Sequence, residues 1–263
     1  MRIDLNSDLG EAFGRYSLGS DRDLMPHITS ANVACGYHAG DPVVMARTVR
    51  HARHCGVNVG AHPGFPDLQG FGRRRMSLSV EEIEAFVVYQ VAALSGFARA
   101  EGTRLAHVKP HGALYTMATE EEEIAEAISR AIKWLDEDLI LVGLAGSRLL
   151  QAGRDAGLRV AREAFVDRAY TADGALRSRS LPGGILKSAQ EVTTQALQIV
   201  RDGVVVTYEG ERLRIEADTL CIHGDTPNAP CMARLVRRRL LEAGVRICPM
   251  DQVVPPAPGG SAR

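Results

Sequence analysis

Short apolar runs alternate with longer segments of helical periodicity along most of the chain, and this alternation restricts the fold more than any other feature. It is typical of β-α units wound around a parallel sheet. A chain of 263 residues is long enough for a single (β/α) barrel, which commonly needs about 250 residues. We expect strands near residues 3–8, 29–35, 57–61, 104–109, 139–144, 159–165, 219–223 and 245–248.

Two segments depart from the alternation. Residues 204–217 read VVVTYEGERLRIEA, with a turn at Glu209-Gly210, and this predicts a β-hairpin inserted between a helix and the next strand. The chain ends in PPAPGGSAR, whose proline, glycine and serine content is typical of a disordered end. We therefore expect one domain over residues 1–250 and a flexible tail over residues 251–263.

Charge and cysteine content indicate the class of partner and the compartment. The chain has 31 basic and 32 acidic residues, so its net charge gives no reason to expect nucleic acid or an anionic membrane as partner. Its five cysteines include no CxxC pair, and an odd count does not suit a closed disulfide framework. No run of about 18 apolar residues is present. We expect a cytoplasmic protein that acts on a small molecule. The sequence leaves open whether the chain forms a homo-oligomer.

The first strand carries polar residues where apolar ones are expected. Asp4, Asn6 and Asp8 alternate along it, and Glu11 follows directly. Alternate residues of a strand share one face, whereas a parallel strand covered by helices is normally apolar on both faces. Burying these groups is costly unless they are hydrogen-bonded or face a hydrated pocket. The pattern therefore predicts a functional site inside the sheet.

Four further strand ends carry similar residues, in the segments SANVACGYHAGDP, GAHPGFPD, HVKPHGALY and CIHGDTP. The carboxyl ends of parallel strands meet at one end of such a fold, and ligands bind there. We expect these side chains to converge on one crevice: Asn32, His38, Asp41, His62, Lys109, His111, His223 and Asp225.

Simpler structural roles could account for some of these residues. A lone histidine in a turn is most often a surface or hydrogen-bonding residue. Asp41 and Asp225 precede prolines at expected helix starts, where an N-cap contributes about 1 kcal/mol and could alone account for them. His107 lies deeper in its strand, so we expect it to support the site rather than contact a ligand.

Metal and nucleotide sites are not fixed by the sequence. Asp8, His38 and His62 could supply one oxygen and two nitrogens to a divalent metal ion, although their wide spacing does not require one. No GxxxxGK[ST] phosphate loop is present.

The blocks DLNSDLGEAFG, SANVACGYHAGDP, GAHPGFPDLQGFGRR, VKPHGALY and CIHGDTP occur in this order, with FVDRAYTADGALRSRS at residues 165–180. Together they resemble the LamB/YcsF family, which is described as PxpA, one of the components of the bacterial ATP-dependent 5-oxoprolinase. The resemblance extends to about residue 250. It implies an irregular (β/α) barrel of about seven parallel strands, similar to the glycoside hydrolase/deacetylase superfamily.

The resemblance also implies a reaction. In it 5-oxo-L-proline is hydrolysed to L-glutamate while ATP becomes ADP and phosphate, with PxpB and PxpC as partner subunits. Coupling to ATP is chemically reasonable because a five-membered lactam is resonance-stabilised. ATP is then a cosubstrate of the complex, bound either here or on a partner.

Residue roles follow as a hypothesis. Lys109 and His111 would stabilise negative charge on the lactam oxygen, Asp8 or Glu11 would act as general base, and His38 or His62 would protonate the leaving nitrogen. Arg168 and Arg179 would pair with the substrate carboxylate or a phosphate. The remaining predicted binding residues are Asn6, Asn32, Asp41, His223 and Asp225.

Two other functions stay open. One is a stand-alone metal-dependent hydrolase or deacetylase of an amide or N-acyl sugar. The other is a subunit that binds 5-oxoproline without catalysing its hydrolysis.

Overall fold

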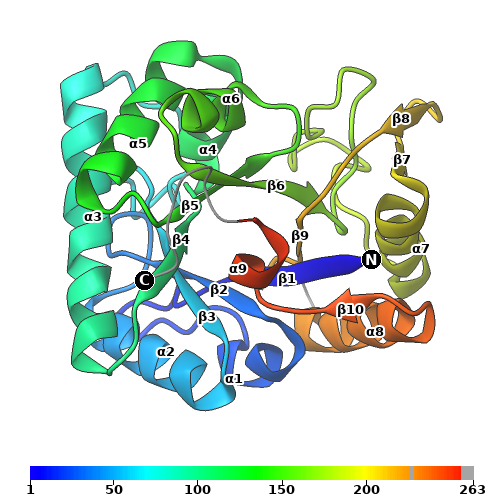
Figure 1. Ribbon diagram of the computed structural model, residues 1–263, viewed down its shortest axis with the longest axis horizontal. Helices are drawn as coiled ribbons and strands as arrows, with labels where there is room; N and C mark the ends of the chain where they lie inside the picture. Colours follow the sequence, from blue (N-terminus) through cyan, green and yellow to red (C-terminus); the bar gives the residue numbers. More distant parts are fainter. Residues whose placement is uncertain (225–227, 256–263) are drawn as a thin grey trace.

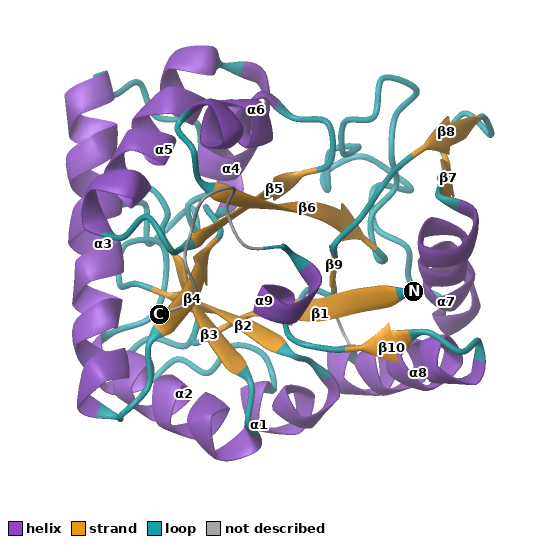
Figure 2. Cartoon of the chain, in the orientation of Figure 1, coloured by secondary structure: helices purple, strands orange, loops and turns teal. Residues whose placement is uncertain are grey.

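Seven parallel strands close into a barrel, and helices surround it (Figure 1). The computed structural model describes residues 1–224 and 228–255. Around the ring the strands follow the order β1-β2-β3-β4-β5-β6-β9, and pairing of β9 with β1 closes it (Figure 2). The expected irregular barrel of about seven parallel strands is therefore confirmed.

The elements alternate along the chain as the apolar pattern predicts. The strands are β1 (Arg2–Leu9), β2 (Ser30–Ala34), β3 (Asn58–His62), β4 (Leu105–Val108), β5 (Ile140–Leu144), β6 (Arg159–Phe165), β7 (Val204–Val206), β8 (Arg212–Arg214), β9 (Thr219–Cys221) and β10 (Arg246–Ile247). The helices are α1 (Asp21–Leu24), α2 (Pro42–Cys55), α3 (Val80–Ala100), α4 (Gly112–Glu120), α5 (Glu122–Leu135), α6 (Arg148–Asp155), α7 (Ala189–Leu197), α8 (Ala229–Glu242) and α9 (Met250–Val253).

All eight predicted strands are present, but the last lies outside the ring. β10 pairs with Arg2 and Ile3 at the start of β1, before the residues of β1 that pair with β2, which begin at Asn6. The inserted hairpin is also confirmed, because β7 and β8 pair antiparallel around a turn in which Gly210 has a φ of +88°.

Helices α2 and α3 begin with side-chain caps. The Asp41 carboxylate accepts hydrogen bonds from the amides of Val43 and Val44 at the start of α2, and Ser79 and Glu82 form a capping box at α3. Over residues 1–224 and 228–255, no helix combines the length and the apolar character needed to cross a membrane.

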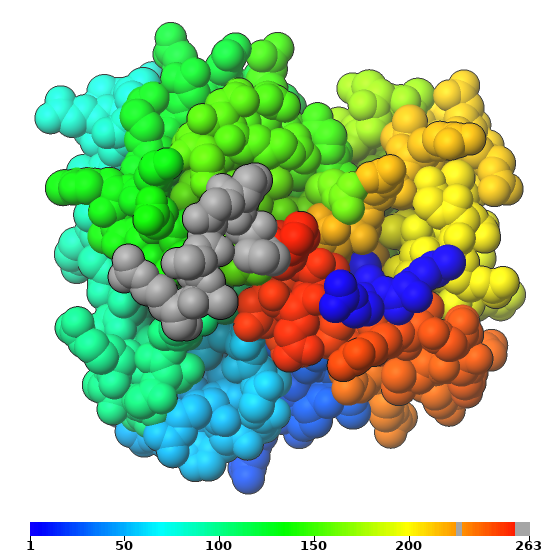
Figure 3. All heavy atoms as spheres, in the orientation of Figure 1, coloured from blue at the N-terminus to red at the C-terminus, as the bar shows by residue number. Residues whose placement is uncertain are grey.

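A short C-terminal helix covers the end of the barrel at which the strands begin. Met250 and Val254 form a buried cluster with Ile140, Val142 and Ala161 of β5 and β6. In the space-filling view of this end, α9 (red) lies near the middle of the face, with the N-terminus (blue) beside it (Figure 3). The predicted start of a flexible tail at residue 251 is wrong, because Asp251, Gln252 and Val253 are helical and Val254 is 5% exposed. Residues 256–263 lie outside the described residues.

The barrel interior contains a polar layer shared by four neighbouring strands. In the strand register Asp8 lies beside Asn32, Asn32 beside Gly60, and Gly60 beside His107. The His107 ring occupies the space into which a side chain at Gly60 would point. Glycine at position 60 therefore makes room for the buried imidazole.

We expect Gly60→Ala to lower the free energy of unfolding by at least about 1–3 kcal/mol, the usual range for overpacking, because the added methyl group would overlap the His107 ring. Urea denaturation measures the effect. Gly96→Ala in α3 is the matched control, since a methyl group there has nothing within 4 Å and alanine is favoured over glycine in helices. Equal stability of the two variants would contradict the steric explanation.

Candidate functional site

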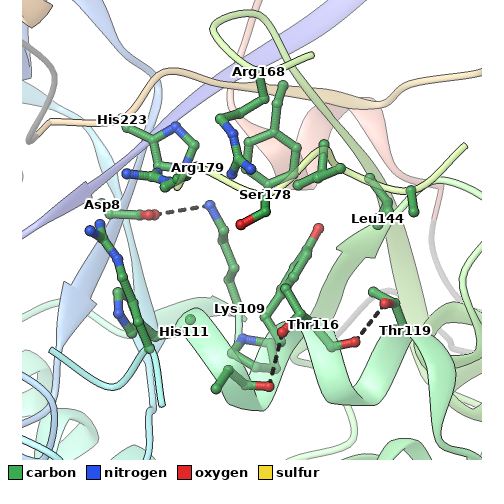
Figure 4. Close-up of a pocket in the computed structure, with 18 of the residues that line it drawn as sticks. Asp8, Lys109, His111, Thr116, Thr119, Leu144, Arg168, Ser178, Arg179 and His223 are labelled. Atoms are coloured by element: carbon green, nitrogen blue, oxygen red, sulfur yellow. Dashed lines mark hydrogen bonds and ion pairs between the residues drawn. The ribbon is translucent and has the colours of Figure 1, made fainter. Parts of the chain in front are cut away.

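A cavity of about 500 Å³ opens at the carboxyl ends of the barrel strands, within the usual range for small-molecule sites. Figure 4 shows the Lys109 ammonium directed at Asp8, with Arg168, Arg179 and His223 on one side of the cavity and Thr116 and Thr119 of α4 on the other. The predicted site residues that line it are Asp8, Glu11, His62, Lys109, His111, Arg168, Arg179 and His223.

Lys109 lies at the centre of a buried ion network and is 2% exposed. Its Nζ lies 2.9 Å from Asp8 Oδ1 and 2.8 Å from Glu163 Oε1, with Cys221 Sγ 3.2 Å away. Burial alone would lower the pKa of Lys109, but the carboxylates of Asp8 and Glu163 raise it well above its usual value. Lys109 is therefore a fixed positive charge in the floor of the cavity.

Asp8 is held ionised by the same network. Burial alone would raise its pKa, but His62 and Lys109 hold the pKa well below the usual 3.8. Its Oδ1 accepts hydrogen bonds from Lys109 and from Asn32 Nδ2 at 2.9 and 2.8 Å, whereas Oδ2 lies 3.4 Å from His62 Nε2. One carboxylate oxygen is thus anchored, and the other faces the imidazoles.

Asn6, Asn32 and His107 lie beneath this network and do not line the cavity. Asn32 Nδ2 donates to Asn6 Oδ1 at 2.7 Å as well as to Asp8, and His107 Nε2 lies 2.7 Å from Asn32 Oδ1. His107 thereby contacts the amide that holds Asp8 and lies beneath the cavity. The two asparagines also lie beneath the site rather than in its wall.

Burial, together with the nearby Lys109 charge, lowers the pKa of His107 to about 3. The unfolded chain gains a proton at His107 below about pH 6.5, which the folded chain does not bind until about pH 3. The free energy of unfolding should therefore fall as the pH drops through this window, by about 1.4 kcal/mol per pH unit for this one group. We expect His107→Gln to show a correspondingly shallower loss between pH 6.5 and pH 5 in urea titrations. If the free energy of unfolding fell equally with pH in the wild type and in His107→Gln, a neutral, buried His107 imidazole would be contradicted.

Glu163 and Tyr115 belong to the site but were not predicted from the sequence. Glu163 is fully buried in β6 and pairs with Lys109, and Tyr115 of α4 donates a hydrogen bond to Glu163 Oε2 at 2.8 Å. An acidic residue between Ala161 and Phe165 on one strand face was a signal of the same kind as Asp4, Asn6 and Asp8. The role of Tyr115 had no such local signal, because it depends on where α4 packs.

Three imidazoles and a carboxylate form a second cluster beside Asp8. The ligand-type atoms of Glu11, His38, His62 and His111 all lie within 4.8 Å of one another. His62 Nδ1 lies 2.7 Å from the Lys109 carbonyl oxygen, and His111 Nε2 lies 2.8 Å from the Phe71 carbonyl oxygen. The other two nitrogens, His62 Nε2 and His111 Nδ1, are 3.0 Å apart. Burial, followed by the neighbouring imidazoles, lowers the pKa of His111 well below its usual value.

The structure places His38 and His62 of the predicted metal-binding trio in one cluster and Asp8 in another. Among the residues that the structure describes, two buried groups could hold a metal ion: Glu11, His38, His62 and His111 in one, and Asp8, Cys221 and His223 in the other. Asp8 Oδ2 lies 3.4 Å from His62 Nε2, whereas Glu11, in the loop after β1, lies 3.4 Å from His38 Nε2 and 3.6 Å from His111 Nδ1.

The opposite wall of the cavity is cationic. Arg168 is 7% exposed, and burial, together with the nearby Arg179 charge, lowers its pKa to about 10. Its guanidinium is held in place by the carbonyl oxygens of Gly184 and Arg177, at 3.1 and 2.6 Å. His223 Nδ1 lies 2.8 Å from Asp167 Oδ1, and the His223 ring stacks on Phe165. This wall is suited to an anionic group.

The other predicted site residues lie elsewhere. His38 is buried behind the cavity wall. Asp41 Oδ2 accepts a hydrogen bond from the Gly14 amide, while Oδ1 caps α2, so its contacts are those of the capping alternative. Asp225 lies outside the described residues.

Comparison with known proteins confirms the family that the sequence blocks resemble. A model of the LamB/YcsF family matches residues 3–255. The A component of a 5-oxoprolinase from Pyrococcus furiosus is 51% identical over 254 residues, 97% of this chain and 100% of that protein. The crystal structure of a lactam utilization protein from Thermus thermophilus is 50% identical, with a TM-score of 0.90 over 94% of this chain and 99% of that one. The catalytic domain of a peptidoglycan N-acetylglucosamine deacetylase from Eubacterium rectale, 11% identical, shares the fold with a TM-score of 0.52 over 100% of this chain and 94% of that one.

Proposed function

Because the chain belongs to the LamB/YcsF family, we propose that it is the A component, PxpA, of an ATP-dependent 5-oxoprolinase. The complex would cleave 5-oxo-L-proline to L-glutamate and convert ATP to ADP and phosphate. The observation that carries this proposal is the 51% identity, over the full length of the relative, to the A component of a 5-oxoprolinase. The cavity at the strand ends supports it, since eight residues predicted for the reaction line that cavity.

The cationic wall is the proposed binding place for the substrate's carboxylate or for a phosphoryl group. Arginine binds both through paired N–H groups, and Arg168 and Arg179 both line the cavity. Hydrogen bonds to two backbone carbonyls already hold the Arg168 side chain, so little conformational entropy is lost when an anion binds there. The lactam carbonyl would then point toward Asp8 and Lys109.

Lys109 and Asp8 have different proposed roles. The N–H groups of Lys109 are directed at Asp8, Glu163 and Cys221, so Lys109 would stabilise negative charge on the lactam oxygen through its field rather than through a direct hydrogen bond. Asp8 remains ionised at neutral pH and lines the cavity. It would accept a proton from the water that attacks the carbonyl carbon.

The complete reaction would need the partner subunits PxpB and PxpC, with ATP as cosubstrate, in the cytoplasm. The purified chain alone, its partners alone, and the three together should be incubated with 5-oxoproline and ATP while glutamate is measured. Glutamate should form only when all three proteins and ATP are present. Equal glutamate formation without this chain would overturn the proposal.

A second candidate is favoured by the cluster of Glu11, His38, His62 and His111. It is a metal-dependent hydrolase of an amide or N-acyl sugar that works without partners. Amide hydrolysis by the isolated chain that stops on addition of a chelator and does not require ATP would favour this candidate. The third alternative, a binding protein without a catalytic role in the complex, would bind 5-oxoproline in calorimetric titrations, and substitutions at Asp8 would leave turnover by the complex unchanged.

A further inference from the structure

We propose that Glu11, His62 and His111 form a binding site for one divalent transition-metal ion, such as Zn²⁺, in the wall of the cavity. The site is defined by the contacts of these residues, so it does not depend on the lactam reaction. It differs from the trio expected from the sequence in that Glu11 and His111 replace Asp8 and His38.

The tautomers of the two histidines are the first argument. A carbonyl oxygen only accepts hydrogen bonds, so His62 Nδ1 and His111 Nε2, which face the carbonyls of Lys109 and Phe71, must each carry a proton. In the neutral rings the remaining nitrogens, His62 Nε2 and His111 Nδ1, then present lone pairs to each other at 3.0 Å. Two lone pairs at this distance repel unless a proton or a metal ion lies between them, so the contact needs a positive charge at this point. Metal-bound histidines typically donate their other N–H to a carbonyl or carboxylate in this way.

The spacing of the donor atoms is the second argument. Bonds of about 2.0–2.1 Å in tetrahedral geometry place neighbouring ligand atoms about 3.3 Å apart. His62 Nε2 and His111 Nδ1 are 3.0 Å apart, and His111 Nδ1 lies 3.6 Å from Glu11 Oε1. Two imidazoles and one carboxylate also match a common ligand set of catalytic zinc sites. Two of the three donor distances are therefore close to the tetrahedral value, and all three donors lie within 4.8 Å of one another.

His38 is the weaker neighbour of this set. Its ring is parallel to that of His111, with an interplanar angle of 3° and a centroid distance of 3.7 Å. In-plane lone pairs of parallel stacked rings do not converge on one point, so both rings cannot coordinate the same ion in this arrangement. Neither His38 nitrogen has a hydrogen-bond partner within the described part of the chain, and Nε2 lies 3.4 Å from Glu11 Oε1. His38 therefore supports the carboxylate and the His111 ring.

The proposed ion would be accessible from the cavity. Glu11, His62 and His111 all line it, whereas His38 does not. A bound ion would keep a position open toward the cavity, as in catalytic rather than structural zinc sites.

The test is metal binding by the intact chain after treatment with a chelator. Zn²⁺ content after gel filtration should be one ion per chain, and Co²⁺ should produce the strong visible absorption of a tetrahedral site. His62→Gln, His111→Gln and Glu11→Gln should each weaken Zn²⁺ affinity by more than the roughly 10–100-fold that loss of a supporting residue costs, and His38→Gln should fall within that range. Circular dichroism identifies any variant that fails to fold. If a variant does not fold, the Co²⁺ spectrum of the wild-type protein still shows whether the chain has a tetrahedral metal site.

Two controls separate this site from others. His54→Gln, at an exposed histidine of α2, should leave both stoichiometry and affinity unchanged. Cys221→Ser tests the alternative group of Asp8, Cys221 and His223 and should also leave Zn²⁺ affinity unchanged. The proposal is overturned if the wild-type chain retains no Zn²⁺ and shows no Co²⁺ absorption, or if Cys221→Ser rather than His111→Gln removes the ion.

Discussion

Replacing Lys109 by methionine should abolish turnover by the assembled complex and lower the free energy of unfolding by about 3–5 kcal/mol, the usual cost of leaving a buried charge without its partner. Methionine preserves most of the side-chain volume but leaves Asp8 and Glu163, which lie 2.9 and 2.8 Å from the ammonium, without a counter-charge. Turnover should fall at least about 10²–10³-fold, because a fixed positive charge near the reacting oxygen is removed.

The double variant Lys109→Met with Glu163→Gln separates these two effects. Neutralising Glu163 removes one of the two uncompensated carboxylates, so much of the lost stability should return, while turnover should not. Urea denaturation measures the first, and glutamate formation by the complex measures the second. Recovery of turnover along with stability would mean that Lys109 acts only by holding the fold together.

Asp8→Asn should reduce turnover by about 10²–10⁴-fold, the range for loss of a general base, while leaving the fold intact. The asparagine oxygen can accept the hydrogen bonds that Lys109 and Asn32 donate to Oδ1. Its amide can donate toward His62 Nε2, which lies 3.4 Å from Oδ2. The substitution therefore keeps the contacts and removes only the basicity and the charge.

Glutamate release by the complex and the unfolding midpoint of the chain are the measurements for this variant. Asp136→Asn, at an exposed residue after α5, is the matched control and should behave as wild type in both. Near-normal turnover by Asp8→Asn would remove Asp8 from the proposed mechanism.

The fold could be predicted from the sequence because its signals are local. Apolar runs marked the barrel strands other than β1, and Asp41 before a proline marked the start of α2. The alternation of Asp4, Asn6 and Asp8 was itself evidence for the barrel interior, since only a hydrogen-bonded or hydrated environment accommodates such a row. The end of the packed chain was misplaced because α9 is short, and its burial depends on contacts with β5 and β6.

The site could be predicted only in part. The rule that ligands bind at the carboxyl ends of parallel strands brought Asp8, His62, Lys109 and His111 together correctly. Which side chain contacts which depends on distances across the barrel that no sequence spacing encodes. Glu163 reaches Lys109 across the barrel interior for this reason.

A crystal structure of the chain with 5-oxo-L-proline bound is the most direct test of the central claim that the strand-end cavity is where the lactam is opened. We predict that the substrate carboxylate contacts Arg168 or Arg179, and that the lactam carbonyl lies on the side of Asp8 and Lys109, with Asp8 within about 3 Å of the carbonyl group or of a water beside it. A lactam bound outside this cavity, or bound within it with its carbonyl turned away from Asp8, would contradict the claim.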